Sequence, residues 1–221
     1  MTTVAIDTHE ERNVAVIDLP GAYLHAYSDE EVLMLLKGPL AELMVMVDPA
    51  IYKKYVIYDS KKEAMLYVKI NKALYGLLHS ALLFYNKLVA DLKAYGFVVN
   101  PYDPCVANNT TGDLQMTVTW HVDDLKVSHK DQTAIDDFAK WLRGKYERKD
   151  QDLFLTHHEG KVHDYLGIDL DYSEKKKLKV SMIKYIDKIF KGFSEDIGTP
   201  VADPAASHLF QVREDGEAKY L

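Results

Sequence analysis

Two adjacent aspartates, Asp123 and Asp124, lie between two apolar runs, and their carboxylates are the first candidates for chemistry in this chain. On a plain strand, neighbouring side chains point to opposite faces, so these two carboxylates could not serve one site. The apolar positions are even before the pair and odd after it: Val118, Trp120, Val122, Leu125 and Val127. This change of phase predicts a hairpin with the aspartates in a two-residue turn and Val122 facing Leu125.

The turn explains how both carboxylates can point to one place, but it does not by itself indicate a function. Aspartate tolerates turn conformations well, so the pair alone is most simply turn chemistry. A register shifted by one residue would place Val122 in the turn, where a positive φ would strain a β-branched side chain.

A third carboxylate changes this interpretation. The apolar run of residues 13–19 predicts a central strand. Asp18 lies near the end of this run, just before the Pro20-Gly21 break. A buried acid needs a partner. Three carboxylates converging from a strand end and a hairpin tip would bind hard divalent cations such as Mg²⁺. Two such ions, about 3.5–4 Å apart, can clamp the attacking and leaving oxygens of a phosphoryl transfer.

The elements expected around these carboxylates are mixed. Helices are predicted at 30–40 (with Asp29 as its cap), 80–96, 134–146 and 184–193. Strands are predicted at 13–19, 96–100, 103–109 and 117–130, the last as the hairpin. Two further strand pairs are predicted, 53–59 with 63–70, and 162–173 with 177–183 as a hairpin about residues 174–177. Strands and helices without regular alternation indicate an α+β fold. The polar residues after 198 are expected to be extended or disordered.

Composition sets limits on the function. The 221 residues are 48% hydrophobic, enough for a sizeable core, and the net charge of −7 does not indicate a basic nucleic-acid-binding face. Such a function would therefore depend on local patches and metal ions. The single cysteine, Cys105, excludes an intrachain disulfide. With no signal peptide evident and no apolar run near the ~18 residues of a membrane span, we expect an intracellular location without membrane contact.

Five blocks of sequence, in order and consistently spaced, point to a family. They are "VIDLPGAYLHAYSDEEVLM", "KINKALYGLLHSALLFYNKL", "GFVVNPYDPCV", "VTWHVDDLKVSH" and "YLGIDLDY…VSMIKYIDKIF". Together, over about residues 14–200, the chain resembles the reverse transcriptase of copia-type LTR retrotransposons. The resemblance implies an α+β polymerase palm, an antiparallel sheet backed by helices, with a partial thumb and the fingers largely missing. It divides the chain into a palm-like core (1–172), a thumb-like hairpin and helix (173–198) and a polar linker (199–221).

The resemblance also implies roles for individual residues. Asp18, Asp123 and Asp124 would be catalytic and bind two Mg²⁺ ions, or Mn²⁺ in their place, with the backbone carbonyl of Leu19. The incoming nucleotide would contact Ala22, Tyr23 and Gly76, with Tyr23 stacking under the deoxyribose. The primer and template would contact Tyr165, Leu166, Gly167, Lys184, Lys188 and Lys191.

From the residues alone, Tyr23 is as consistent with a plain core tyrosine as with a nucleotide contact. The three lysines are also explained by an ordinary solvated helix face. The implied activity is that of an RNA-directed DNA polymerase, a nucleotidyltransferase in a retrotransposon polyprotein. The implied partners are a primed RNA or DNA template, deoxynucleoside triphosphates and the rest of the polyprotein. In this family the location is the cytoplasm, within a virus-like particle.

The chain departs from the family at several positions. His121 replaces the tyrosine of the Y-x-D-D motif, Tyr75 replaces a polar residue before Gly76, and Arg12 is the only Lys or Arg before Asp18. The alternative function is therefore a catalytically inactive or domesticated palm-fold remnant that binds nucleic acid or is purely structural. His157, His158 and His163 match no zinc pattern and are predicted to lie in a loop.

Overall fold

The structure, a computed structural model, describes residues 2–148, 150 and 152–193. It divides the chain into two units, Met1–Met182 and Ile183–Leu221, which are described separately below. All three sheets belong to the first unit and are antiparallel. Helices accompany each sheet, so the expected mixture of helices and antiparallel sheets is confirmed.

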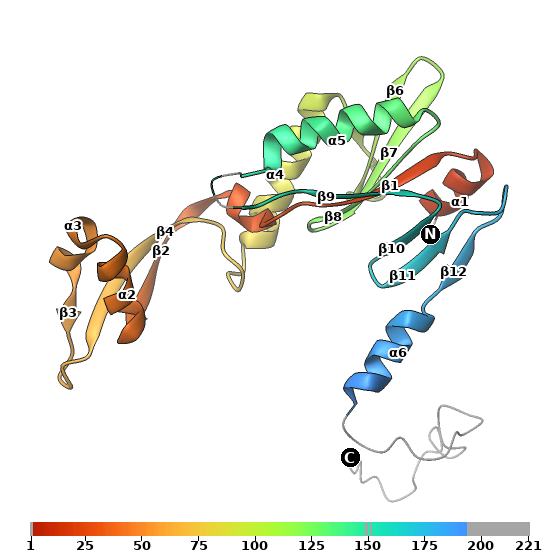
Figure 1. The fold of residues 1–221 in the computed structure, drawn as a ribbon. Helices are drawn as coiled ribbons and strands as arrows, with labels where there is room; N and C mark the ends of the chain where they lie inside the picture. Colours follow the sequence, from red (N-terminus) through yellow and green to blue (C-terminus); the bar gives the residue numbers. More distant parts are fainter. Residues whose placement is uncertain (1, 149, 151, 194–221) are drawn as a thin grey trace, which may run out of the picture. The chain divides into compact units, whose positions relative to one another are not determined.

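A six-stranded sheet carries the predicted carboxylates (Figure 1). Its strands, in spatial order, are β5 (Val98–Val99), β6 (Val106–Thr111), β7 (Leu114–His121), β8 (Asp124–His129), β1 (Asn13–Asp18) and β9 (Thr156–Gly160). The apolar strand β1 lies between β8 and β9, as its sequence predicted. β9 was not predicted, because its polar sequence THHEG lacks an apolar alternation.

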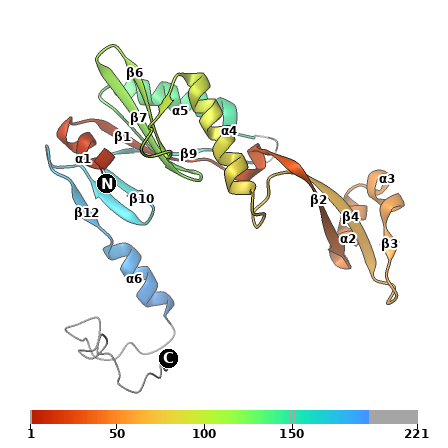
Figure 2. The same cartoon turned by 180° about the vertical axis from the view of Figure 1, so that it is seen from behind.

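Two amphipathic helices, α4 (Ser80–Tyr95) and α5 (Gln132–Tyr146), cover one face of this sheet (Figure 2). Both helices were predicted from their apolar periodicity. The buried positions of α4 recur at helical spacing in Phe84, Leu88 and Leu92, and they join one core with side chains of β1, β7 and β8. The other face carries buried side chains such as Val14, Lys126 and Ser128, which do not belong to this core.

The register of the β7–β8 hairpin differs from the predicted one. Trp120 pairs with Leu125 and His121 with Asp124, so Val122 and Asp123 form the turn. The predicted pairing of Val122 with Leu125 is wrong, and Val122 has a φ of 56°. The neighbouring strand β1 accounts for the shift, since it pairs along the whole of β8 and the Leu19 N–H donates to the Asp123 carbonyl oxygen at 3.0 Å.

A second sheet, in the order β2-β4-β3, forms between β1 and α4 in the chain. It consists of β2 (Tyr27–Lys37), β4 (Ala64–Lys72) and β3 (Ile57–Tyr58), accompanied by α2 (Pro39–Val47), α3 (Pro49–Tyr52) and the short 3₁₀ helix η2 (Lys53–Tyr55). Its small core contains Ala41, Ala64 and Leu66. The predicted β3–β4 pairing is confirmed, but the helix predicted at 30–40 is wrong. Pairing with β4 outweighs the helix propensity of its Glu, Leu and Met residues.

A third sheet contains β10 (Val162–Tyr165), β11 (Ile168–Asp171) and β12 (Lys179–Ser181). The predicted hairpin around residues 174–177 joins β11 to β12. The N-terminal helix α1 (Thr2–His9), which the sequence analysis did not predict, shares a small core with this sheet. That core includes Val4, Val14, Leu170 and Tyr172.

The described part of the second unit is the helix α6 (Ile183–Gly192), close to the predicted helix 184–193. The unit boundary at Met182 falls after β12, whereas the resemblance placed a domain boundary at 172, between β11 and β12. The predicted linker, residues 199–221, lies outside the described residues. Within the described part of the chain, no helix is long and apolar enough to cross a membrane.

Candidate active site

The three predicted carboxylates gather where β1 ends and β8 begins. Asp18 is the register partner of Asp124, and Asp123 lies in the turn immediately before β8. Directly opposed residues of an antiparallel pair have Cβ atoms about 4.5–5.5 Å apart on one face of the sheet. The register therefore sets two carboxylates side by side, and the turn adds the third next to them.

This face lies opposite the helices. Ile17 and Leu125, next to the carboxylates in sequence, are fully buried under α4 and α5, whereas Asp18 and Asp124 are half-buried. His121, which replaces the motif tyrosine, is exposed and pairs with Asp124 across the hairpin. Its side chain therefore points away from the apolar core.

Burial and mutual repulsion raise the pKa values of two of these acids, Asp18 and Asp124. The pKa of Asp18 is raised by burial and then by the charge of Asp123, while a hydrogen bond with Thr156 acts in the opposite sense. The pKa of Asp124 is raised by burial and then by the charges of Asp123 and Asp18, and His121 opposes this shift. The carboxylates are thus near enough to resist simultaneous ionisation, which a bound cation would relieve.

The chemistry of these side chains suits a hard divalent cation, because the cluster supplies several carboxylate oxygens on a partly buried surface. Among the residues that the structure describes, however, no group of three or more His, Cys, Asp or Glu side chains stands ready to hold a metal ion. Asp18, Asp123 and Asp124 therefore fit the cation in donor type and charge. Their convergence on a metal remains a prediction.

Two tyrosines lie beside the carboxylates. Tyr23, on the 3₁₀ helix η1 (Ala22–His25), is partly buried against the core, and its ring centroid is 4.4 Å from that of Tyr75. The pKa of Tyr75 is raised by burial and then by Asp123. Tyr75, which sequence reasoning treated only as a departure from the family, is thus part of the site. Ala22 is fully buried, backbone included, so its predicted contact with a nucleotide stays a prediction.

Gly76 follows Tyr75 and has a φ of +95°, which L-residues with a side chain rarely adopt. A Cβ atom added there would meet nothing within 4 Å. The backbone conformation, rather than a contact inside the protein, therefore explains the glycine. Its predicted approach to a nucleotide stays a prediction.

The turn that joins β10 to β11 also lies near the carboxylates. Leu166 and Gly167 form this turn at φ values of 56° and 75°. The Tyr165 hydroxyl donates to the Thr119 carbonyl oxygen on β7 at 3.5 Å, and its pKa is raised by burial and then by Asp124. The structure thus places the predicted primer-contacting turn beside the β7–β8 hairpin. By contrast, Lys184, Lys188 and Lys191 lie on α6 in the second unit, and their role stays a prediction.

The three histidines do not lie in a loop, so that prediction is wrong. His157 and His158 are on β9, and His163 is on β10. Two side chains contact His157: Glu159, on the same strand, lies 3.1 Å from its Nε2, and Arg143 on α5 lies 3.2 Å from its Nδ1.

Arg12 does not contribute to the active site. It is buried and contacts Thr117 at 2.9 Å and Glu10 at 3.0 Å. The only Lys or Arg before Asp18 is therefore used within the fold.

Comparison with known proteins identifies the family. A family model described as "Reverse transcriptase (RNA-dependent DNA polymerase)" matches residues 2–206, which is most of the chain. The chain therefore belongs to the reverse transcriptase family.

One curated protein and one solved structure are similar to the chain. The chain is 23% identical, over 210 residues, to the retrovirus-related Pol polyprotein from transposon TNT 1-94 of Nicotiana tabacum. The match covers 94% of this chain and 14% of that polyprotein. These findings confirm the predicted resemblance to the reverse transcriptase of copia-type LTR retrotransposons.

Among solved structures, apo telomerase from Candida tropicalis matches with a TM-score of 0.40 and 9% identity, over 80% of this chain and 35% of that chain.

Proposed function

We propose that this chain carries the nucleotidyl-transfer centre of an RNA-directed DNA polymerase, with Asp18, Asp123 and Asp124 as the metal ligands. The observation that carries the proposal is the register of β1 against β8, which pairs Asp18 with Asp124 at the tip where Asp123 lies. The raised pKa values of Asp18 and Asp124 support it, because burial and then the charges of neighbouring aspartates cause them, as in many catalytic sites.

The reaction is attack of a primer 3′-hydroxyl on the α-phosphate of a deoxynucleoside triphosphate, with release of pyrophosphate. When bound, two Mg²⁺ ions, or Mn²⁺ in their place, lower the pKa of the attacking hydroxyl and neutralise the triphosphate. The deprotonated carboxylates of Asp18, Asp123 and Asp124, together with the Leu19 carbonyl, would hold the ions. Tyr23, packed on Tyr75, supports the sugar of the incoming nucleotide and leaves no room for a 2′-hydroxyl.

The remaining elements take their proposed roles from this centre. The six-stranded sheet with α4 and α5 serves as the palm. The turn at Tyr165, Leu166 and Gly167 grips the primer beside the hairpin, and α6 belongs to a thumb whose lysines contact phosphates. Residues 27–72, with their own sheet and core, are a candidate for part of the fingers, which the sequence analysis expected to be largely missing.

A second candidate function is a palm-fold remnant that binds nucleic acid without catalysis. It is favoured by the observation that, across the described residues, no three potential ligand side chains are grouped closely enough to hold a metal ion. If the carboxylates cannot converge even on a primed template, the chain would bind the duplex and transfer nothing.

Primer extension tests both candidates. The chain is mixed with a labelled primer annealed to an RNA or a DNA template, deoxynucleoside triphosphates and Mg²⁺ or Mn²⁺. We expect extension on both templates, abolished by EDTA and restored by excess Mg²⁺, because the reaction needs the bound cations. Tight binding of the primed template without extension under either metal would contradict the polymerase and favour the remnant.

A further inference from the structure

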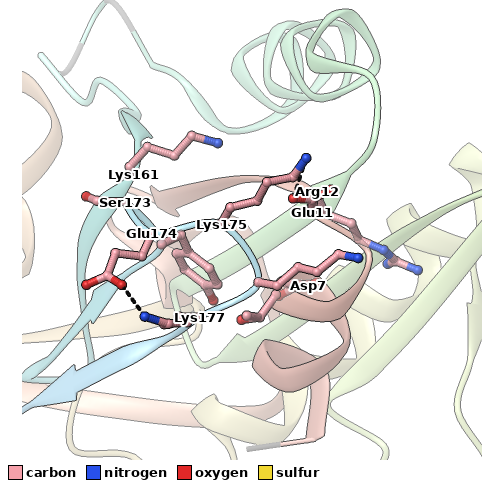
Figure 3. Close-up of a pocket in the computed structure, with 11 residues that line it drawn as sticks. Asp7, Glu11, Arg12, Lys161, Ser173, Glu174, Lys175 and Lys177 are labelled. Atoms are coloured by element: carbon pink, nitrogen blue, oxygen red, sulfur yellow. Dashed lines mark hydrogen bonds and ion pairs between the residues drawn. The ribbon is translucent and has the colours of Figure 1, made fainter.

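A pocket of about 210 Å³ lies between α1 and the turn that joins β11 to β12, within the first unit of the chain (Figure 3). Its lining includes Asp7, Arg12, Lys161, Tyr172, Lys175 and Lys176. Arg12 precedes β1, whereas Asp18 ends it, so the pocket lies about 20 Å from the carboxylate cluster along that strand. It is therefore separate from the proposed active site.

Two buried polar atoms of the pocket lack a partner. The Asp7 side chain is 1% exposed; its Oδ2 accepts from Lys126 Nζ at 2.5 Å, but its Oδ1 has no hydrogen-bond partner. The hydroxyl of Tyr172, a residue only 9% exposed, also has none. Buried polar atoms are nearly always paired, so one acceptor and one donor are left for a ligand. The pKa of Tyr172 is raised by burial and then by Asp7, which indicates that the two groups are close.

The charges at the pocket are unbalanced in favour of cations. Each lining carboxylate is already paired with a lysine, in the pairs Asp7–Lys126, Glu11–Lys175 and Glu174–Lys177. Lys161 and Lys176 line the same pocket, and among the described residues neither ammonium group has a hydrogen-bond or ion-pair partner. In a chain with a net charge of −7, two unpaired ammonium groups beside a buried hydroxyl donor favour an anion.

The fold positions the backbone of these residues, and the side chains of Lys161 and Lys176 are exposed. The Tyr172 N–H donates to the Lys161 carbonyl oxygen at 2.7 Å, which joins the strand ends that carry the donor and one of the lysines. Figure 3 shows lysine side chains from two separate loops around the one pocket. Lys176 has a φ of 55°, an unusual conformation for a residue with a side chain.

We propose that this pocket binds a phosphate monoester group. Lys161, Lys176 and the Tyr172 hydroxyl contact its oxygens as donors, and Asp7 Oδ1 accepts from its protonated oxygen. A monoester retains such a proton on about half of the molecules near pH 6. Sulfate and the internal phosphodiesters of a nucleic acid have no proton there, so the buried acceptor would stay unpaired against them. The pocket therefore selects a free phosphate end.

Calorimetric titration of the full chain with inorganic phosphate and with sulfate, at pH 6 and fixed ionic strength, tests the selectivity. We expect sulfate to bind at least about 10-fold more weakly, because a buried acceptor left unpaired is costly. The variant Lys161→Gln/Lys176→Asn should lose phosphate affinity by about 10-fold or more. The matched variant Lys61→Gln/Lys93→Gln removes two exposed lysines elsewhere and should bind as the parent does. Equal binding of sulfate and phosphate, or equal losses in both variants, would overturn the proposal.

Tyr172→Phe separates binding from folding. Because the hydroxyl has no partner in the protein, its removal should leave the thermal midpoint without phosphate unchanged or slightly higher, while phosphate affinity falls about 5-fold. A lower midpoint with unchanged phosphate affinity would show a structural role for the hydroxyl and contradict the proposal.

Two sources of the phosphate can be distinguished with the same variants. If the source is a strand end, a 5′-phosphorylated oligonucleotide should bind more tightly than its 5′-hydroxyl counterpart, and Lys161→Gln/Lys176→Asn should remove the difference. If the source is a small molecule, a nucleoside monophosphate should bind and the two oligonucleotides should not differ. Binding of neither would overturn the proposal. These titrations contain no divalent cation and no primed template, so their results do not depend on the proposed polymerase activity.

Discussion

Asp123→Asn is expected to reduce the rate of primer extension by about 1,000-fold or more, the loss typical of removing one strong electrostatic contact to a transition state. Asp123 lies in the β7–β8 turn, next to the paired Asp18 and Asp124. The amide keeps the shape of the side chain but removes the charge that would bind a cation. Single-turnover extension of a labelled primer with saturating nucleotide measures the effect.

The control is Asp113→Asn, the same change at the other end of β7. Asp113 is exposed in the turn between β6 and β7, at the opposite end of the strand from the carboxylates. We expect extension within about 2-fold of the parent, since exposed substitutions away from a site have small effects. If Asp123→Asn and Asp113→Asn extend the primer equally well, the assignment of the metal ligands is wrong.

Asp7→Ala is expected to lower the free energy of unfolding by about 3–5 kcal/mol, the cost of leaving one partner of a buried ion pair uncompensated. Asp7 on α1 and Lys126 on β8 are 2.5 Å apart, and each side chain is 1% exposed. Without the carboxylate, the Lys126 ammonium would remain buried beside the six-stranded sheet. Equilibrium unfolding in urea measures the loss.

Two further variants test whether burial is the cause. The pair Lys177–Glu174 has a similar separation of 2.7 Å, but its side chains are 74% and 73% exposed, so Glu174→Ala should cost at most about 1 kcal/mol. The double variant Asp7→Leu/Lys126→Met, which removes both charges, should be close to the parent in stability. Equal losses for Asp7→Ala and Glu174→Ala would contradict the buried-pair account.

Most of the elements that could be predicted are segments whose apolar residues follow a recognisable local pattern. The strand ending at Asp18 and the helices α4 and α5 each bury one regular set of side chains, and a local pattern reveals such sets. The segment Tyr27–Lys37 was mispredicted because its composition favours a helix, and only pairing with the distant β4 makes it a strand. The polar strand β9 had no periodic signal.

That Asp18, Asp123 and Asp124 lie near one another could be predicted from the sequence, but the register that brings them together could not. Asp18, Asp123 and Asp124 are located by a strand end and a change of apolar phase, which are local signals. The register could not be predicted because β1, more than 100 residues away, decides which residues form the turn. Contacts between distant segments also place Tyr75 beside the carboxylates and Tyr172 and Lys161 around one pocket, so no local pattern could indicate these positions.

The central claim, that the three carboxylates hold divalent cations, is tested most directly by titrating Mn²⁺ and following the free ion by electron paramagnetic resonance. The chain is saturated with a dideoxy-terminated primer–template and the matching nucleotide, so that the complex is complete and no reaction occurs. We predict that Asp18→Asn weakens Mn²⁺ binding by about 10–100-fold relative to the parent and to Asp113→Asn. An unchanged Mn²⁺ affinity in Asp18→Asn would contradict the metal site.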